Sequence, residues 1–212
     1  MVTSHPKALM IRNMIWQVIA KLGIGVFILV GVIWGYAGSP RSFKEYTFLS
    51  NLIEGLVLVV AAVLPLVTGR QLPTWLDLAL VIMALIMLGI VVTNYHIFNF
   101  AGAFLLLHVI NPVLVFSHWL VVTEKGRIGP PARVLTVAVA PLCYIVFLLI
   151  HGQVTGDYIY SIFDVATLGW PHVGVFIAAV SAVAIGLAYA LDAADTAMAR
   201  RFAKTSPLKG GH

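Results

Sequence analysis

Six long apolar segments constrain this chain more than any other feature of its sequence. Each is about 20 residues or longer, the length that an α-helix needs to cross the roughly 30 Å hydrocarbon layer of a membrane. They occupy residues 14–37, 47–69, 75–97, 101–122, 132–151 and 171–193. The segments lack the alternating pattern of barrel strands, so helices are the structure that satisfies their backbone polar groups in lipid. The sequence therefore predicts an all-α integral membrane protein, a bundle of six transmembrane helices.

The composition excludes an ordinary soluble domain. Hydrophobic residues make up 61% of the 212 residues and charged residues only 10%, and the mean hydropathy is +1.01. The six segments use nearly the whole chain, so we expect no separate soluble domain. Cys143 is the single cysteine, which excludes an intrachain disulfide and a cysteine-based metal site.

The distribution of the positive charges predicts the topology. Ten of the 13 Lys and Arg residues fall in the N-terminus, the second and fourth loops and the C-terminal tail, whereas only Arg41 and Lys44 fall in loops on the opposite side. The positive-inside rule places both termini in the cytoplasm. We expect a cytoplasmic lead-in at 1–13, a transmembrane domain at 14–195 and a basic cytoplasmic tail at 196–212.

The same observations indicate partners and location. The first segment has no convincing cleavage site, so it is interpreted as a retained helix and not as a signal peptide. The net charge of +5 is explained by topology, and we expect no nucleic-acid partner; the expected partners are membrane lipids. We expect a multi-pass membrane protein, and the short loops and minimal tails favour the inner membrane of a bacterium.

The longest loop, 152–170, is predicted to be external. It contains two acidic residues, four aromatic residues and no Lys or Arg, which is not the composition of a loose linker. Two interpretations remain open. The aromatic side chains sit at the membrane interface, or the loop is a lid over an outward-facing pocket.

A row of polar residues lies where hydrocarbon is expected. Thr47, Ser50, Asn51 and Glu54 follow the spacing i, i+3, i+4 and i+7, which places them on one face of a helix. Polar and ionisable groups inside a membrane are costly and often mark function. The ordinary alternative is hydrogen bonding between helices, which is common in membrane bundles.

A histidine occupies a similar depth in the fourth segment. His108 lies about seven residues past an outer turn, roughly 10 Å below the surface at 1.5 Å per residue, and Asn111 and Pro112 follow it. A Thr hydroxyl becomes a nucleophile when a base such as His takes its proton, and Asn or Ser side chains can donate to an oxyanion. The pattern thus allows a hydrolytic Thr47–His108 site, with a buried structural histidine as the alternative.

Three stretches resemble the androgen-induced gene 1 / androgen-dependent TFPI-regulating protein family and its bacterial relatives. They are YTFLSNL at 46–52, LLLHVINPVLVFSHWLV at 105–121 and YIYSIFDVATLG at 158–169. Their order and spacing, the six helices and the cytoplasmic termini also agree over about residues 15–195. Position 118 departs from the bacterial relatives, which often carry an acid where this chain has His118.

The resemblance implies an intramembrane threonine hydrolase. Family members on the animal side cleave fatty acid esters of hydroxy fatty acids with a Thr nucleophile and a His, which match Thr47 and His108. The expected substrate is a lipid ester that enters from the bilayer. The residues expected to line its pocket are Ser50, Asn51, Glu54, Asn94, Asn111, Tyr158 and Asp164.

Two other functions stay open on the sequence. The first is a non-catalytic binder or transporter of a lipid or small molecule, which would use the same outward pocket and could couple to protons through Glu54. The second is a haem or metal redox protein. His118 has no other His at its depth, and the external His and Asp residues match no zinc motif, so we expect no metal site and no cofactor.

Overall fold

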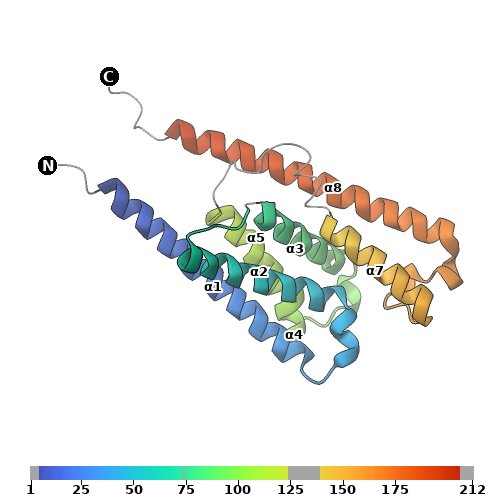
Figure 1. Cartoon of the computed structure of the whole chain (residues 1–212). Helices are drawn as coiled ribbons and strands as arrows, with labels where there is room; N and C mark the ends of the chain where they lie inside the picture. The colour runs from blue at the N-terminus through green and yellow to red at the C-terminus, as the bar shows by residue number, and fades with distance from the viewer. Residues whose placement is uncertain (1–4, 74, 124–138, 206–212) are drawn as a thin grey trace. The chain divides into compact units, whose positions relative to one another are not determined.

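The structure is a computed structural model that describes residues 5–73, 75–123 and 139–205, and every element in these ranges is helical (Figure 1). The long helices are α1 (His5–Tyr36), α2 (Tyr46–Thr68), α3 (Trp75–Thr93), α7 (Val139–Thr155) and α8 (Val165–Thr205). A further helix is built from α4 (Gly102–Leu105), the π-helical turn η3 (Leu106–Ile110) and α5 (Asn111–Val121), which follow one another without a break. Short 3-10 turns are η1 (Pro40–Lys44), η2 (Tyr95–Ile97) and η4 (Ser161–Phe163).

Five of these helices are long and apolar enough to cross a membrane. They cover Asn13–Tyr36, Tyr46–Thr68, Trp75–Thr93, Gly102–Val121 and Val165–Arg201. The apolar helix Val139–Thr155 is shorter, and the first residues of the predicted span 132–151 lie outside the described part of the chain. The described part of the chain is therefore all-helical, with several apolar helices of membrane-spanning length, and it is compatible with integral membrane localisation. The exact number of spans and the side of the termini stay predictions.

Several sequence predictions fall wholly or partly outside the described residues. They concern the first residues of the lead-in 1–13, the basic residues of the loop 124–138 and the end of the tail 196–212. Where they are described, both ends belong to helices. The lead-in continues into the first span as one helix, α1, and the tail begins within α8.

The chain forms two compact units. Unit 1 comprises the described parts of Met1–Pro73 and Met83–Thr123, and unit 2 comprises those of Thr74–Ile82 and Glu124–His212. Unit 1 therefore holds α1, α2 and the helix that contains η3, and unit 2 holds α7 and α8. The polar row on α2 and His108 both belong to unit 1.

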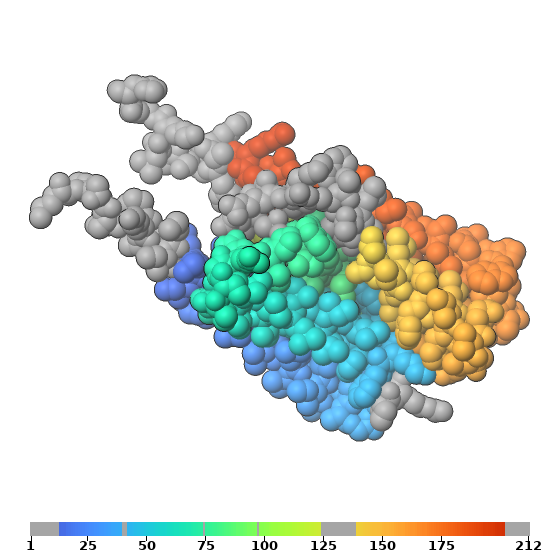
Figure 2. Space-filling view, in the orientation of Figure 1, coloured from blue at the N-terminus to red at the C-terminus, as the bar shows by residue number. Residues whose placement is uncertain are grey.

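In unit 1, α1 and α2 lie side by side (Figures 1 and 2). The two helices approach closely at two glycines. A Cβ added to Gly25 would lie 2.9 Å from the carbonyl oxygen of Gly55, and a Cβ added to Gly55 would lie 2.7 Å from Leu29. Membrane helices associate through small residues that let the backbones approach. This contact fixes α1 against the turn of α2 that carries Glu54.

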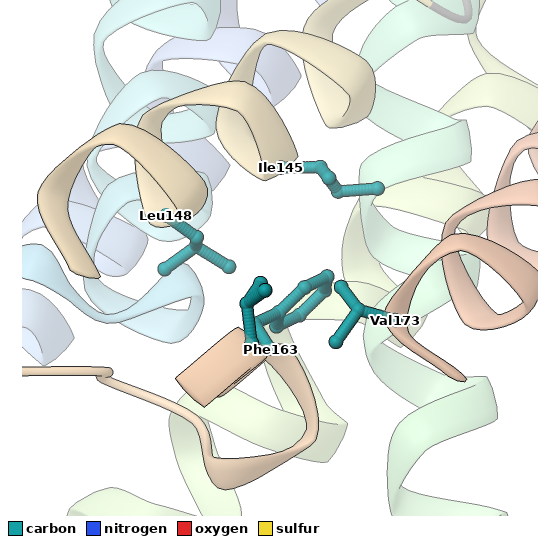
Figure 3. Packing of buried hydrophobic residues seen from close by; sticks show 5 residues of the cluster. Ile145, Leu148, Phe163 and Val173 are labelled. Atoms are coloured by element: carbon teal, nitrogen blue, oxygen red, sulfur yellow. The ribbon is translucent and has the colours of Figure 1, made fainter. Parts of the chain in front are cut away.

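In unit 2, a small apolar core joins α7 to the start of α8 (Figure 3). Its buried members are Ile145, Leu148, Phe163, Val165 and Val173. The segment between the helices is shorter than the predicted loop 152–170, because α7 continues to Thr155 and α8 begins at Val165. The helical path of α8 is interrupted at Gly169, whose φ is 76°, two residues before Pro171.

We predict that Gly25→Val destabilises unit 1. The added side chain meets the Gly55 carbonyl, which cannot rotate away, and overpacking of this kind costs about 1–3 kcal/mol. Gly23→Val is the matched control, because nothing lies within 4 Å of a Cβ at Gly23 in the same helix. Thermal unfolding of both variants in detergent measures the difference. Equal melting temperatures would contradict the close contact.

Candidate active site

The centre of the candidate site is a direct contact between Thr47 and His108. Thr47 is the second residue of α2, and its Oγ1 lies 3.0 Å from His108 Nε2. Both side chains are buried, with exposed fractions of 6% for Thr47 and 8% for His108. The structure therefore brings together the hydroxyl and the imidazole that the sequence placed at similar depth on two segments. The Thr47 hydroxyl also lies 3.9 Å from Met87 Sδ of α3, a weak acceptor.

The hydrogen bond at Nδ1 of His108 determines whether Nε2 can accept a proton. Nδ1 lies 2.9 Å from the Phe104 carbonyl oxygen, and a carbonyl only accepts hydrogen bonds. Nδ1 must therefore carry a hydrogen, which leaves Nε2 of the neutral ring as an acceptor for the Thr47 hydroxyl. The ring also stacks on Phe104, with centroids 3.7 Å apart and an angle of 14°. Phe104 thus holds both the tautomer and the orientation that a general base requires.

His108 lies in a π-helical turn, and the neighbouring proline explains this turn. Pro112 has no N–H, and its ring crowds the carbonyl of the residue four positions earlier, which is His108. The Asn111 N–H donates to the Leu106 carbonyl, five residues back, in place of the Leu107 carbonyl of a regular α-helix. The widened turn therefore releases the Leu107 carbonyl from the backbone ladder. Single π turns of this kind are frequent at functional sites.

Asn51 occupies the position that the widened turn opens. Its Nδ2 donates to the Leu107 carbonyl at 3.1 Å and to the Thr47 carbonyl at 2.8 Å, and its Oδ1 accepts from Asn111 Nδ2 at 2.7 Å. Asn51 therefore connects α2 to the turn that carries His108. Because both amide hydrogens face backbone carbonyls, Asn51 positions the Thr47–His108 pair and does not supply a donor to a substrate.

The other polar side chains of the row, those of Ser50 and Glu54, lie further along α2. Ser50 Oγ is 3.4 Å from the Thr47 carbonyl, to which it donates. Glu54 is 1% exposed, and among the described residues its Oε2 has no hydrogen-bond partner, as is also true of Asn111 Oδ1. Two buried acceptor atoms without donors are costly to the fold. Hydrogen bonds thus account for the burial of Thr47, Ser50 and Asn51, whereas one oxygen of Glu54 is buried without a partner among the described residues.

Asn94 does not join this cluster. It lies at the end of α3, where its amide donates to the Ile90 carbonyl and to the Thr93 hydroxyl, both at 2.9 Å. These bonds satisfy groups at the end of its own helix. Neither of these hydrogen bonds involves Thr47 or His108, and the place of Asn94 in the pocket stays a prediction.

Tyr158 and Asp164, the remaining predicted pocket residues, belong to unit 2. They line a pocket there, together with residues of α7 and α8. Asp164 precedes the first residue of α8 and accepts from Thr167, from its hydroxyl at 2.7 Å and from its backbone N–H at 3.0 Å. These two hydrogen bonds hold the pKa of the Asp164 carboxyl below its usual range.

Sequence reasoning missed the groups that orient the pair. The Phe104 and Leu107 carbonyls are backbone atoms, so residue identity does not reveal them. Two sequence signals could have indicated them. His108 lies four residues after Phe104, a spacing that lets a histidine bond to a carbonyl of its own helix. Pro112 lies four residues after His108 and disturbs the helix there. In the described residues, no group of three or more His, Cys, Asp or Glu could hold a metal ion.

Comparison with models of protein families, with curated proteins and with solved structures gives no match. The interpretation of the site therefore depends on its own geometry.

We predict that Asn51→Ala lowers the free energy of unfolding by about 1–3 kcal/mol, because it leaves the buried Leu107 carbonyl without a donor. Asn94→Ala is the matched control. It removes an amide that bonds within an exposed helix end, and we expect a change within about 0.5 kcal/mol. Unfolding in detergent, followed by circular dichroism, measures both. Equal stability of the two variants would show that Asn51 does not connect the helices.

We predict that Asp164 makes the stability of the protein depend on pH in the acid range. Because its pKa is lower in the folded chain, its contribution is fully present above the unfolded pKa of about 3.9 and is lost as the pH falls through the folded value. Asp164→Asn keeps a helix-capping side chain but does not titrate. The melting temperature of the wild type should exceed that of the variant at pH 7 and approach it at pH 3. A constant difference would contradict this role.

Proposed function

We propose that the chain is a six-span membrane protein with cytoplasmic termini, and that Thr47 and His108 hydrolyse a lipid ester. The observation that carries the proposal is the 3.0 Å contact between the Thr47 hydroxyl and the unprotonated nitrogen of His108. A hydroxyl becomes a nucleophile when an adjacent base is oriented by a third group. Here the third group is the Phe104 carbonyl.

The reaction follows from the roles of the two side chains. His108 Nε2 takes the proton as Thr47 Oγ1 attacks the ester carbonyl, and the carbonyl π electrons move to its oxygen. The tetrahedral intermediate collapses, the ester C–O bond breaks, and His108 gives its proton to the leaving alcohol. Water then attacks the acyl-threonine while His108 takes a proton from it. The acid leaves, and the returned proton restores the Thr47 hydroxyl.

The start of α2 is suited to stabilise the negative oxygen. Thr47 lies in the first turn, where backbone N–H groups have no acceptor within the helix and the helix dipole is positive. Groups of this kind are effective donors to an oxyanion when water is excluded. Both hydrogens of the Asn51 amide already bond to carbonyls. We therefore propose that backbone N–H groups of this turn donate hydrogen bonds to the oxyanion.

The surroundings of the pair favour an acyl substrate. The His108 ring is flanked by the Phe104 and Phe98 rings, and both reacting side chains are buried. An ester with long acyl chains could reach such a site from the bilayer, where the chains are already solvated. We further propose that the chain is related to the androgen-induced gene 1 family, which it resembles. Its substrates would then be fatty acid esters of hydroxy fatty acids or similar lipids, and its location the bacterial inner membrane.

A second function rests on Glu54. A buried carboxyl with an unpartnered oxygen inside an apolar helix is the kind of group that couples a membrane transporter to protons. A non-catalytic binder or transporter of this type would depend on Glu54 and would not need the Thr47 hydroxyl. Substitution of each residue in turn distinguishes the two functions.

We predict that Thr47→Val and His108→Ala each lower the rate of ester hydrolysis by about 100-fold or more, the contribution expected of a positioned base or nucleophile. Valine keeps the shape of threonine and removes the hydroxyl. Purified protein in detergent is assayed for fatty acid released from a fatty acid ester of a hydroxy fatty acid.

Thr93→Val and His96→Ala are the matched controls, because both lie at the exposed outer end of α3 and η2. They should retain wild-type turnover. Full turnover in folded Thr47→Val or His108→Ala protein would exclude this mechanism. If neither the wild type nor any variant hydrolyses the ester but Glu54→Gln loses ligand binding, the second function is favoured.

A further inference from the structure

The pocket of unit 2 contains none of the side chains that carry out the steps of the proposed hydrolysis. It has a volume of about 520 Å³ and is formed by the end of α7, the connecting segment and the start of α8. The aromatic and charged side chains of its lining are those of Tyr158, Asp164 and Trp170, and Gln153 adds an amide. Tyr158 and Trp170 supply the aromatic rings and Asp164 the carboxylate.

The Tyr158 ring is held in a fixed position. It lies directly against the backbone of α7 at Gly152, where a Cβ would overlap the ring carbons. Its hydroxyl accepts a hydrogen bond of 2.7 Å from Gln153 Nε2. Only glycine at position 152 allows this arrangement, so the absence of a side chain there serves to form the aromatic wall.

Trp170 provides the second aromatic surface. It follows Gly169, whose positive φ interrupts the helix, and 58% of its surface is exposed. A large exposed aromatic side chain that lines a pocket is available to a ligand. Membrane proteins also concentrate tryptophan at the level of the lipid headgroups.

Asp164 gives the pocket a negative charge. It accepts two hydrogen bonds from Thr167, yet a carboxylate has about four acceptor positions, so further positions remain for a ligand. The segment 152–170 contains no Lys or Arg. The partial positive charge at the start of α8 weakens the negative potential around the carboxylate but does not cancel it.

We propose that this pocket binds an alkylammonium group, of the kind carried by choline and by the headgroups of zwitterionic phospholipids. Aromatic faces attract such cations through their quadrupoles, and quaternary ammonium ligands are recognised in this way. The carboxylate supplies the opposite charge. The proposal does not depend on hydrolysis at Thr47, because the pocket is built from residues of unit 2 alone.

The test uses the full chain purified in a maltoside detergent. Choline chloride, with sodium chloride at equal ionic strength as reference, probes the free cation. A short-chain phosphatidylcholine, with phosphatidylglycerol of the same chain length as reference, probes the headgroup. Binding is measured by isothermal titration calorimetry. Saturable binding of choline identifies a free cation as ligand, and binding of phosphatidylcholine alone identifies a lipid headgroup.

Asp164→Asn is the decisive variant, because it removes the charge, and Asn caps a helix as well as Asp. One of the two acceptor oxygens becomes an NH2 donor, so the Thr167 hydroxyl must accept in place of donating. We expect Asp164→Asn and Trp170→Leu each to weaken binding at least tenfold. Asp157→Asn, which removes the other carboxylate of the segment outside the pocket lining, should bind as the wild type does. Binding of neither probe, or unchanged binding by folded Asp164→Asn protein, would overturn the proposal. Loss of hydrolysis in Thr47→Val would leave this binding intact.

Discussion

The hydrogen bond from the Asn51 amide to the Leu107 carbonyl is the interaction on which the candidate site depends. It joins α2 to the π-helical turn and fixes the distance between the two backbones that carry Thr47 and His108. The carbonyl is available because Pro112 does not fit a regular α-helix at this point. In a lipid environment a released carbonyl has no water to bond, so the wide turn requires a polar side chain opposite it.

The two glycines at the α1–α2 contact complement this interaction. Gly25 and Gly55 let the helices approach on one side of α2, while Asn51 faces the π-helical turn from a neighbouring position on the same helix. Van der Waals packing and interhelical hydrogen bonds are the forces that associate helices in a membrane. α2 is thus held by close backbone packing on α1 and by a polar contact to the turn that carries His108.

The sequence could predict the helices and a similar depth for Thr47 and His108, because helical spacing and depth along a span depend only on position. It could not show that the two helices touch, which the 3.0 Å contact establishes. It could not predict the π-helical turn, which arises from competition between a proline and the hydrogen-bond ladder. Nor could it show that the Asn51 amide is engaged with two carbonyls, since backbone acceptors are not encoded by residue type. Asn94, Tyr158 and Asp164 were also expected to line the pocket. Asn94 bonds to its own helix end, and Tyr158 and Asp164 line a pocket within unit 2, so their part in a site with Thr47 stays a prediction.

Activation of the Thr47 hydroxyl by His108 is the step on which the proposed hydrolysis depends. The most direct measurement treats the purified, folded protein with a fluorophosphonate probe and locates the modified residue by mass spectrometry. We expect a phosphonylated Thr47 in the wild type and no modification of Thr47 in folded His108→Ala protein. An unmodified Thr47 in the folded wild type, or equal modification with and without the imidazole, would contradict it.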